Sequence, residues 1–437
     1  MTKEEGSRRL LSSWKEVAAY LGCDKRTCYR WEKSLGLPVR RVEGASRSRV
    51  FAYADEIDRW REERLGGGPG PGNRPASKAV AKALPLMGLA SVGLVAAVLF
   101  IPKLLGSRPP SDFHIRGAIL SVLDDKGREL WKYDTGLENL ETEAIYRQHF
   151  QFRRINPENW AGVLPHLVIR DLDADGRPEV LFSTQTQDEF TEGELICFGS
   201  RGDIRWRIRS GREMTFGEEN FSADYRIHGL VVADLNGDGR SEIVVDSFHR
   251  PNFPSQILVL DPAGKTIGEY WSSGQFIDIV VHDLDGDGKP EIIAGGTNNE
   301  YRSGVLAVFR ADRVHGASPQ TLDHYKCRGL DPGTQEFFVL LPRADVDIVE
   351  AHQESVAAIE ILKSDKISVL MLFSGIYYEF GFDFRAAEAL SGHRFEKLHA
   401  LAAAEGKVKR IANEAYFKDL RDRIRFWGRN GWSAQPD

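Results

Sequence analysis

The clearest pattern in the chain is a repeat of short apolar runs on both sides of polar, glycine-containing loops between residues 160 and 310. The runs before the loops are 167–169, 230–232 and 279–281, and the runs after them are 180–182, 243–245 and 292–294. Apolar runs of this length, bounded by turn residues, are typical of buried strands. Further apolar runs come next, at 194–198, 256–260 and 304–309. The pattern therefore predicts a repeated antiparallel unit of strands.

The spacing of the repeat indicates one all-β architecture. The loops begin at residues 171, 234 and 283. A four-stranded unit that recurs about every 50 residues predicts a β-propeller, whose blades close a ring because one blade cannot bury its own faces. Residues 115–134 match the second half of a blade, and Asp345 and Asp347 form a possible degenerate loop. We expect five to seven blades over 112–437, with the N-terminal half-blade paired to C-terminal strands and an amphipathic helix at 411–427.

A second pattern is the uncharged stretch from Ala83 to Pro102, which lies between Lys82 and Lys103. A helix that crosses a bilayer needs roughly 20 apolar residues, so this stretch predicts one transmembrane helix at 83–105. The glycine- and proline-rich residues 66–82 before it predict a flexible linker. More basic residues precede the span than follow it, which favours a cytoplasmic N-terminus.

The first 65 residues have a third pattern, with apolar residues at helical spacing over 14–21 and again over 25–35. Ser13 and Glu16 form a capping-box pattern for the first helix, and Gly22 ends it. Residues 39–42 and 50–53 predict a β-hairpin, and 55–65 predict a last helix. This order of elements over 8–65 predicts a small α+β domain with a helix-turn-helix.

The head resembles a winged helix-turn-helix of the MerR/excisionase type, on the run Ser13–Lys33 and the following Leu35–Arg41. The resemblance implies that the second helix enters the major groove of DNA and that the hairpin reaches the backbone or minor groove. Basic and polar side chains of the second helix and the hairpin suit contacts to phosphates or base edges. The candidate DNA-binding residues are Lys25, Arg26, Thr27, Arg30, Arg40, Arg41, Arg47 and Arg49. A protein–protein use of the same head is the alternative.

Charge separates the two ends of the chain of 437 residues. Residues 1–65 hold 15 Lys or Arg and 11 Asp or Glu, whereas 112–437 hold 38 and 53. A basic head and an acidic body indicate different partners, nucleic acid for the head and cations for the body. The four cysteines do not form a disulfide framework, and Cys197, within an apolar run, is expected in the core.

Each loop of the repeat carries the same set of oxygen-bearing residues at its positions 1, 3, 5 and 9, with a glycine at position 6. Close-packed oxygen ligands suit Ca²⁺, and the backbone carbonyl of position 7 can complete the set. The alternative is a group of Asx turns without metal. We expect about three calcium ions. The candidate ligands are Asp171, Asp173, Asp175, Arg177 and Glu179; Asp234, Asn236, Asp238, Arg240 and Glu242; and Asp283, Asp285, Asp287, Lys289 and Glu291.

The body resembles the FG-GAP/VCBS repeat family of calcium-binding propellers, such as those of integrin heads, although the literal Phe-Gly and Gly-Ala-Pro signatures are absent. The resemblance covers about 160–310. The chain has no nucleophile elbow, His-Glu-x-x-His, phosphate loop or redox cysteine pair. We therefore predict that the protein is not an enzyme.

Together these patterns predict a multidomain chain: a winged helix-turn-helix at 8–65, a linker at 66–82, a transmembrane helix at 83–105 and a propeller with a C-terminal helix at 112–437. The predicted function is a one-component transcriptional regulator in a bacterial inner membrane. Its head binds double-stranded DNA in the cytoplasm, its calcium-loaded propeller senses an extracytoplasmic ligand or protein, and two copies pair as a homodimer. The alternative is a membrane-anchored adhesion or scaffold propeller whose head docks a cytoplasmic protein.

Overall fold

The computed structural model describes residues 10–11, 13–21, 28, 32, 37–41, 50–65, 108–148, 164–187, 193–250 and 253–436. The chain divides into two compact units, 1–96 and 97–437. They are called the head and the body below, and each is described by itself.

The head has a three-stranded sheet and two described helices. The strands are β1 (Leu10–Leu11), β2 (Arg40–Arg41) and β3 (Val50–Tyr53), in the order β1-β3-β2, and the helices are α1 (Trp14–Leu21) and α3 (Ala54–Leu65). The backbone N–H of Glu16 donates to the Ser13 hydroxyl at 3.3 Å, as the capping pattern predicts. Val17 and Ile57 are fully buried in the core of the head. Apart from Cys28 and Glu32, the predicted second helix at 25–35 lies outside the described residues.

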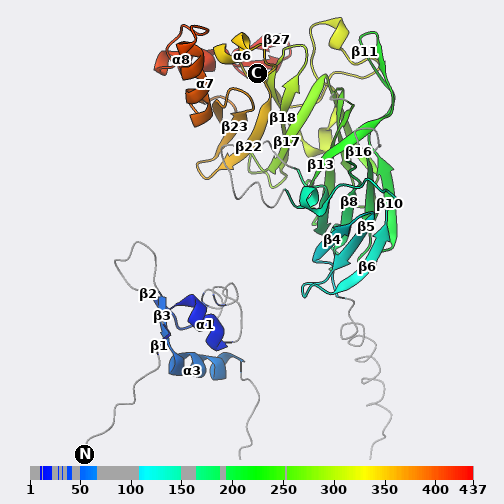
Figure 1. Ribbon diagram of the computed structural model, residues 1–437, viewed down its shortest axis with the longest axis vertical. Helices are drawn as coiled ribbons and strands as arrows, with labels where there is room; N and C mark the ends of the chain where they lie inside the picture. Colours follow the sequence, from blue (N-terminus) through cyan, green and yellow to red (C-terminus); the bar gives the residue numbers. More distant parts are fainter. Residues whose placement is uncertain are drawn as a thin grey trace, which may run out of the picture. The chain divides into compact units, whose positions relative to one another are not determined.

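The body is built from five sheets in chain order, and their strands are antiparallel except for β20, which pairs with β16 in parallel (Figure 1). Sheet 1 contains β4 (Asp112–Arg116), β5 (Ile119–Leu123) and β6 (Glu129–Asp134). Sheet 2 contains β7 (Leu167–Arg170), β8 (Glu179–Ser183), β9 (Glu194–Phe198) and β10 (Ile204–Arg209). Sheet 3 contains β13 (Tyr225–Ala233), β14 (Glu242–His249), β15 (Ser255–Leu260) and β16 (Thr266–Ser272), extended by β20 (His315–Ala317). Sheet 4 contains β17 (Gly274–His282), β18 (Glu291–Asn298), β19 (Ser303–Arg310) and β21 (Phe337–Leu340), extended by β26 (Arg425–Gly428) and β27 (Gly431–Ser433). Sheet 5 contains β22 (Val356–Leu362), β23 (Lys366–Met371), β24 (Tyr377–Gly381) and β25 (Ala387–Leu390).

Short elements join these sheets. They are the hairpin β11 (Met214–Phe216) and β12 (Glu219–Phe221), the 3₁₀ turns η1 (Ala311–Arg313) and η2 (Asp323–Tyr325), and the helices α6 (Asp345–Val349), α7 (His393–Ala404) and α8 (Glu414–Asp422). In Figure 1 the helices α7 and α8 lie at the end of the body that holds sheet 5.

The sheets pack face to face, each against the next. One apolar cluster joins sheets 1 and 2, a second joins sheets 2 and 3, a third joins sheets 3 and 4, and a fourth joins sheet 4 to sheet 5 and to α7 and α8. Every residue of β8 and of β15 is buried, because these strands are covered on both faces. A fully buried aliphatic or aromatic side chain contributes about 1.5–3 kcal/mol, so this stacking is the main source of stability. Cys197 is fully buried in the second cluster, which confirms its predicted core position.

The predicted fold class is wrong. The described chain is mostly β with few helices, and no apolar cluster among its described residues joins sheet 5 to sheet 1, so no closed propeller is found. The half-blade at 115–134 does not pair with C-terminal strands: sheet 1 consists of β4, β5 and β6 alone, and β26 and β27 extend sheet 4 instead. A repeat sets the strands of each sheet, but closure depends on contacts between the ends of the chain, which no local pattern encodes.

Two further expectations are wrong, and a third lies outside the described residues. Among the described residues, no helix is long and apolar enough to cross a membrane. The predicted span at 83–105 and the linker at 66–82 lie outside the described residues. Asp345 and Asp347 begin the helix α6 rather than forming a loop of the repeat. The helix expected at 411–427 is shorter, because residues 425–428 leave it to form β26.

Gly229 marks the closest approach of sheet 3 to the segment that enters sheet 2. A Cβ atom at this position would lie 2.2 Å from the Cβ of Leu164. Gly229→Ala is therefore expected to destabilise the protein by about 1–3 kcal/mol, measured by thermal or urea unfolding. Gly381→Ala is the matched control, since its nearest neighbour is a side-chain oxygen at 3.3 Å. Equal stability of the two variants would contradict this packing.

Candidate metal centre

The three polar loops connect the first and second strands of sheets 2, 3 and 4. Loop 1 (171–179) lies between β7 and β8, loop 2 (234–242) between β13 and β14, and loop 3 (283–291) between β17 and β18. The same strand pair frames each loop, so the repeat in sequence becomes a repeat in structure. All fifteen candidate metal ligands lie in these three loops.

Backbone amides order the carboxylates in each loop. The carboxylate at position 1 accepts a hydrogen bond from the N–H of the glycine at position 6; the bonds are Gly176 to Asp171 (2.8 Å), Gly239 to Asp234 (2.8 Å) and Gly288 to Asp283 (3.0 Å). These glycines have φ of 83°, 85° and 82°, a conformation that favours glycine over other residues. The position-5 carboxylate accepts from the N–H of position 7; these bonds are Arg177 to Asp175 (2.7 Å), Arg240 to Asp238 (2.8 Å) and Lys289 to Asp287 (2.8 Å).

The glutamate at position 9 reaches back to the start of each loop. Its carboxylate accepts from the N–H of the leucine at position 2; the bonds are Leu172 to Glu179 (2.9 Å), Leu235 to Glu242 (2.8 Å) and Leu284 to Glu291 (2.9 Å). These glutamates are 1–3% exposed. The bond closes each loop, so a buried carboxylate faces the aspartates of positions 1 and 3.

Two of the loops bring three carboxylates together. Oxygens of Asp171, Asp173 and Glu179 lie within 4.8 Å of one another, and so do those of Asp283, Asp285 and Glu291. Three negative groups this close repel one another, and a hard cation with oxygen ligands offsets that repulsion. In loop 2, Asn236 holds position 3, and its side-chain N–H₂ donates to Glu242 at 2.9 Å. The donor set fits a calcium ion in loops 1 and 3, and loop 2 offers one carboxylate fewer.

Burial and backbone hydrogen bonds act in opposite directions on the pKa values of the loop carboxyl groups. Burial raises the pKa of Glu179, Glu242 and Glu291, and the neighbouring aspartates raise it further. In Asp234 burial also acts upward, but the N–H groups of Gly239 and Gly237 outweigh it and lower the pKa of its carboxyl group. The position-1 aspartate of loop 2 is thus held in its charged form by the backbone.

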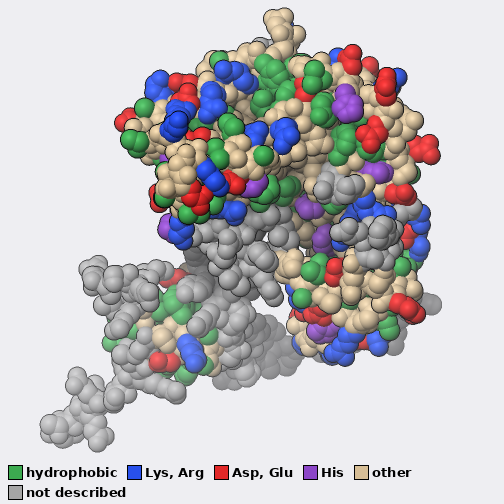
Figure 2. Space-filling model, turned by 45° about the horizontal axis from the view of Figure 1, so that its top comes forward, with side chains coloured by type: hydrophobic (Ala, Val, Ile, Leu, Met, Phe, Trp, Pro, Cys, Tyr) green, Lys and Arg blue, Asp and Glu red, His purple; other side chains and the backbone are tan. Residues whose placement is uncertain are grey.

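Arg205 is a loop-1 neighbour that the sequence analysis missed. It projects from β10, and its guanidinium lies 2.7 Å from Asp173 and 3.0 Å from Glu179. Burial opposes its charged form, but these carboxylates raise the pKa of Arg205. No pattern in the sequence around Arg205 marks it as a partner of loop 1. Figure 2 shows basic and acidic side chains interspersed over the visible face of the body.

The structure says little about the candidate DNA-binding residues. Lys25, Arg26, Thr27, Arg30, Arg47 and Arg49 lie outside the described residues, and only the backbone of Arg41 is described. Arg40 pairs with Glu56 at 2.8 Å and lies 5.5 Å from the centre of the Tyr53 ring. The side chain of Arg40 is half exposed, so it is held against α3 while still reaching solvent.

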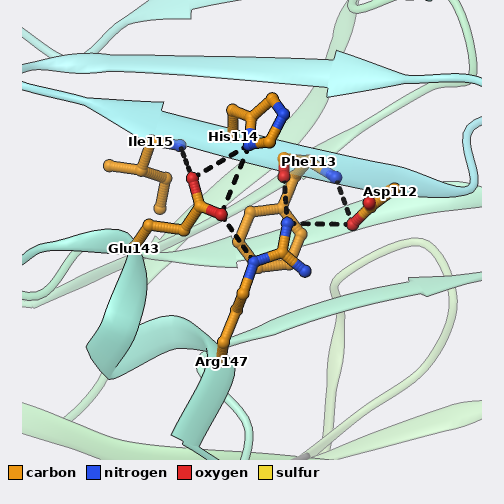
Figure 3. Close-up of polar contacts among 6 residues, drawn as sticks. All are labelled: Asp112, Phe113, His114, Ile115, Glu143 and Arg147. Carbon is orange, nitrogen blue, oxygen red and sulfur yellow. Dashed lines mark hydrogen bonds and ion pairs between the residues drawn. The ribbon is translucent and has the colours of Figure 1, made fainter. Parts of the chain in front are cut away.

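A second polar cluster covers the free edge of sheet 1 (Figure 3). Sheet 1 has three strands, and the edge of β4 has no partner strand among the described residues. Residues 143–148 are helical, and Glu143 and Arg147 take the place of a strand. The N–H of Ile115 donates to Glu143 at 3.0 Å, and Arg147 donates to the carbonyl of Phe113. Glu143 acts as the acceptor, and Arg147 acts as the donor, that a neighbouring strand would otherwise supply.

Ion pairs hold this edge cover in position. Arg147 pairs with Glu143 at 2.6 Å and with Asp112 at 3.0 Å, and its guanidinium lies 4.3 Å from the centre of the Phe113 ring. Burial opposes the charged form of Glu143, but Arg147 and the Ile115 N–H lower the pKa of Glu143. The cover borders a cavity of about 680 Å³ that is also lined by apolar residues of β7, β13 and β17.

Removal of the edge cover is expected to weaken the body. Glu143→Ala leaves the buried N–H of Ile115 without its acceptor and Arg147 without its closest carboxylate, which costs about 1–3 kcal/mol. The change is measured as a lower urea midpoint. The exposed Glu138→Ala serves as the control, and an unchanged midpoint in Glu143→Ala would contradict the role of the cover.

Comparison with known proteins supports the repeat. Residues 171–245, which include loops 1 and 2, match the FG-GAP-like repeat family. No curated protein matches the chain.

Solved structures resemble the chain only distantly. A rhamnogalacturonan lyase, YesW, is 13% identical with a TM-score of 0.30, and the match covers 55% of each chain. An exotype rhamnogalacturonan lyase, YesX, is 15% identical with a TM-score of 0.31, covering 61% of this chain and 47% of that one. The Dos1 propeller is 10% identical with a TM-score of 0.29, covering 63% of this chain and 64% of that one. The chain thus spans about half to two thirds of the length of these structures.

These neighbours correct the prediction that the protein is not an enzyme. Two of the three are rhamnogalacturonan lyases. TM-scores near 0.3 assign no activity to this chain.

Proposed function

We propose that the chain is a DNA-binding regulator whose body is a calcium-binding domain of FG-GAP-like repeats that senses a ligand or a protein. The observation that carries the calcium part is the common geometry of the three loops. In each loop, backbone N–H groups fix the carboxylate of position 1, and a buried glutamate from position 9 closes the ring of oxygens. A bound calcium ion offsets the negative charge of these carboxylates.

The residues of each loop have separate tasks in this proposal. The side chains of positions 1, 3, 5 and 9 and the carbonyl of position 7 hold the ion. The glycine of position 6 turns the backbone, so that its N–H orients the first carboxylate. The glutamate ties the loop to the second strand of its sheet. Calcium therefore fixes the first and second strands of three neighbouring sheets relative to each other.

The regulatory part of the proposal rests on the sequence. The head is basic, carries a cluster of arginines and resembles a winged helix-turn-helix. Double-stranded DNA is its proposed partner, and pairing of two copies supplies the affinity that one small head lacks. The proposed location is a bacterial inner membrane, with the head in the cytoplasm and the body outside. This location rests on the uncharged residues 83–102 and the charges around them.

Chromatin capture of the tagged full-length protein, followed by sequencing of the bound DNA, tests the regulatory part. We expect a few sharp peaks, which Arg26→Ala with Arg30→Ala abolishes and Lys15→Ala, an exposed change on α1, leaves intact. Background alone from an expressed protein would contradict DNA binding and favour a head that docks another protein.

A further inference from the structure

The strand register places one residue of the fourth strand at the same position beside each loop. In each sheet, the residue two positions after the loop glutamate lies on the second strand and pairs with one residue of the third strand. That residue of the third strand pairs in turn with one residue of the fourth strand. The two sets of pairs are Leu181–Cys197–Trp206, Val244–Val259–Gly268 and Ile293–Val308–Phe337. The residue just before each fourth-strand partner is therefore equivalent in the three sheets. These residues are Arg205, Ile267 and Glu336.

The three equivalent residues differ in charge. Arg205 is positive and contacts two carboxylates of loop 1. Ile267 is neutral and 42% exposed. Glu336 is negative, but the charge of Arg310 opposes it more strongly than that of Asp285 in loop 3 adds to it. Among the three positions, only Arg205 has a direct contact to loop carboxylates that the structure defines by distance.

The charges within and beside the loops differ as well. Loop 3 has four acidic ligands; the charges of Glu336 and Arg310 beside it oppose each other, and Arg310 lies 3.7 Å from Asp287. Loop 2 has three acidic ligands, because Asn236 replaces an aspartate. Loop 1 has the same four acidic ligands as loop 3, and the single positive charge of Arg205 is shared between two of them. In oxygen-ligand sites, calcium affinity rises with the number of ligand charges.

We propose that Arg205 holds the calcium affinity of loop 1 below that of loop 3, which has the same set of ligands. Arg205 is the counter-ion of loop 1 at low calcium. Calcium enters loop 1 only when the guanidinium leaves Asp173 and Glu179, so this loop fills after loop 3. The body therefore responds to calcium over a wider concentration range than three equal sites would allow. This inference rests on the proposed calcium binding.

Calorimetric titration of the full chain with calcium, after treatment with chelator, tests the inference. The wild-type protein is expected to show a tight and a weak class of sites. Asp283→Asn removes a tight site and Asp171→Asn removes a weak one, which assigns loops 3 and 1 to their classes. Arg205→Gln is expected to tighten the weak class roughly tenfold and to leave the tight class unchanged.

Two further variants serve as checks. Arg207→Gln lies on the same strand β10 but pairs with Glu194 at 3.5 Å, so its calcium affinities should equal those of the wild type. Arg205→Lys keeps the positive charge but lacks the planar guanidinium. The calcium affinity of its weak class should lie between those of the wild type and Arg205→Gln. If the wild type binds calcium but Arg205→Gln leaves the weak class unchanged, this inference alone is overturned. If the wild type binds no calcium, the proposed function of the body fails with it.

Discussion

Calcium that fills three sites is expected to raise the melting temperature of the full chain, and chelation to lower it, by roughly 15–30 °C. Each site adds about 2.7 kcal/mol of stability when free calcium is 100 times its dissociation constant, and a domain of this size melts roughly 2–4 °C higher per kcal/mol. The physical reason is the close approach of the three carboxylates in loops 1 and 3, whose mutual repulsion calcium removes. The measurement is a thermal melt followed by circular dichroism with added calcium or chelator.

Matched variants connect this effect to the loops. Asp283→Asn removes the position-1 ligand of loop 3 and should reduce the calcium-dependent rise by about a third or more, because loop 3 binds calcium more tightly than loop 1. Asp125→Asn changes an exposed acid outside the loops and should leave the rise unchanged. A melting temperature that ignores calcium in the wild type, or equal rises in both variants, would contradict metal binding by the loops.

The second large effect is expected from a buried carboxyl pair next to sheet 5. Asp347 in α6 is 1% exposed and Glu354 is fully buried. Glu354 accepts hydrogen bonds from the N–H groups of Ser355, Phe373 and Ser374, each at 2.9 Å. These three donors fix the carboxyl group of Glu354 beside Asp347, whose side chain forms a hydrogen bond with Glu354.

Burial, followed by the charge of Glu354, raises the pKa of Asp347 to about 8, while the N–H of Ala344 and the nearby Arg343 act in the other direction. The unfolded chain loses this proton near pH 4, so the folded state binds it more tightly. This contribution to stability is complete below about pH 4 and is lost progressively as the pH rises to about 8.

Asp347→Asn removes the titrating group and keeps its shape. The variant is expected to gain stability relative to the wild type as the pH rises, by an amount of the order of a few kcal/mol at pH 8. The measurement is urea unfolding from pH 4 to 8. Asp331→Asn, an exposed change, controls for the loss of a charge. Parallel pH profiles of Asp347→Asn and the wild type would show that Asp347 is not protonated in the folded state.

The strands and loops of sheets 2 to 4 could be predicted because their signals are local. The apolar runs beside each loop became β7 and β8, β13 and β14, and β17 and β18. The glycine at position 6 of each loop has the positive φ that its turn requires. The apolar runs, the turn residues and the spacing of the acidic residues within each loop all lie within about ten residues of one another. This is the range over which sequence patterns are informative.

The rest could not be predicted because it depends on distant partners. β21 pairs with β19 although a long segment of chain separates the two strands. β26, near the end of the chain, pairs with β21. Glu143 and Arg147 complete the edge of β4 from a helix that follows sheet 1. Arg205 reaches loop 1 through the register of two intervening strands. None of these pairings leaves a mark in the sequence beside the residues involved.

A count of bound calcium ions tests the central claim most directly. Native mass spectrometry of the full chain, freed of metal and then exposed to calcium, gives the number of ions per chain. The account predicts up to three ions, with one lost in each of the variants Asp171→Asn, Asp234→Asn and Asp283→Asn. A chain that binds no calcium at millimolar concentrations, or that binds the same number in all three variants, would contradict it.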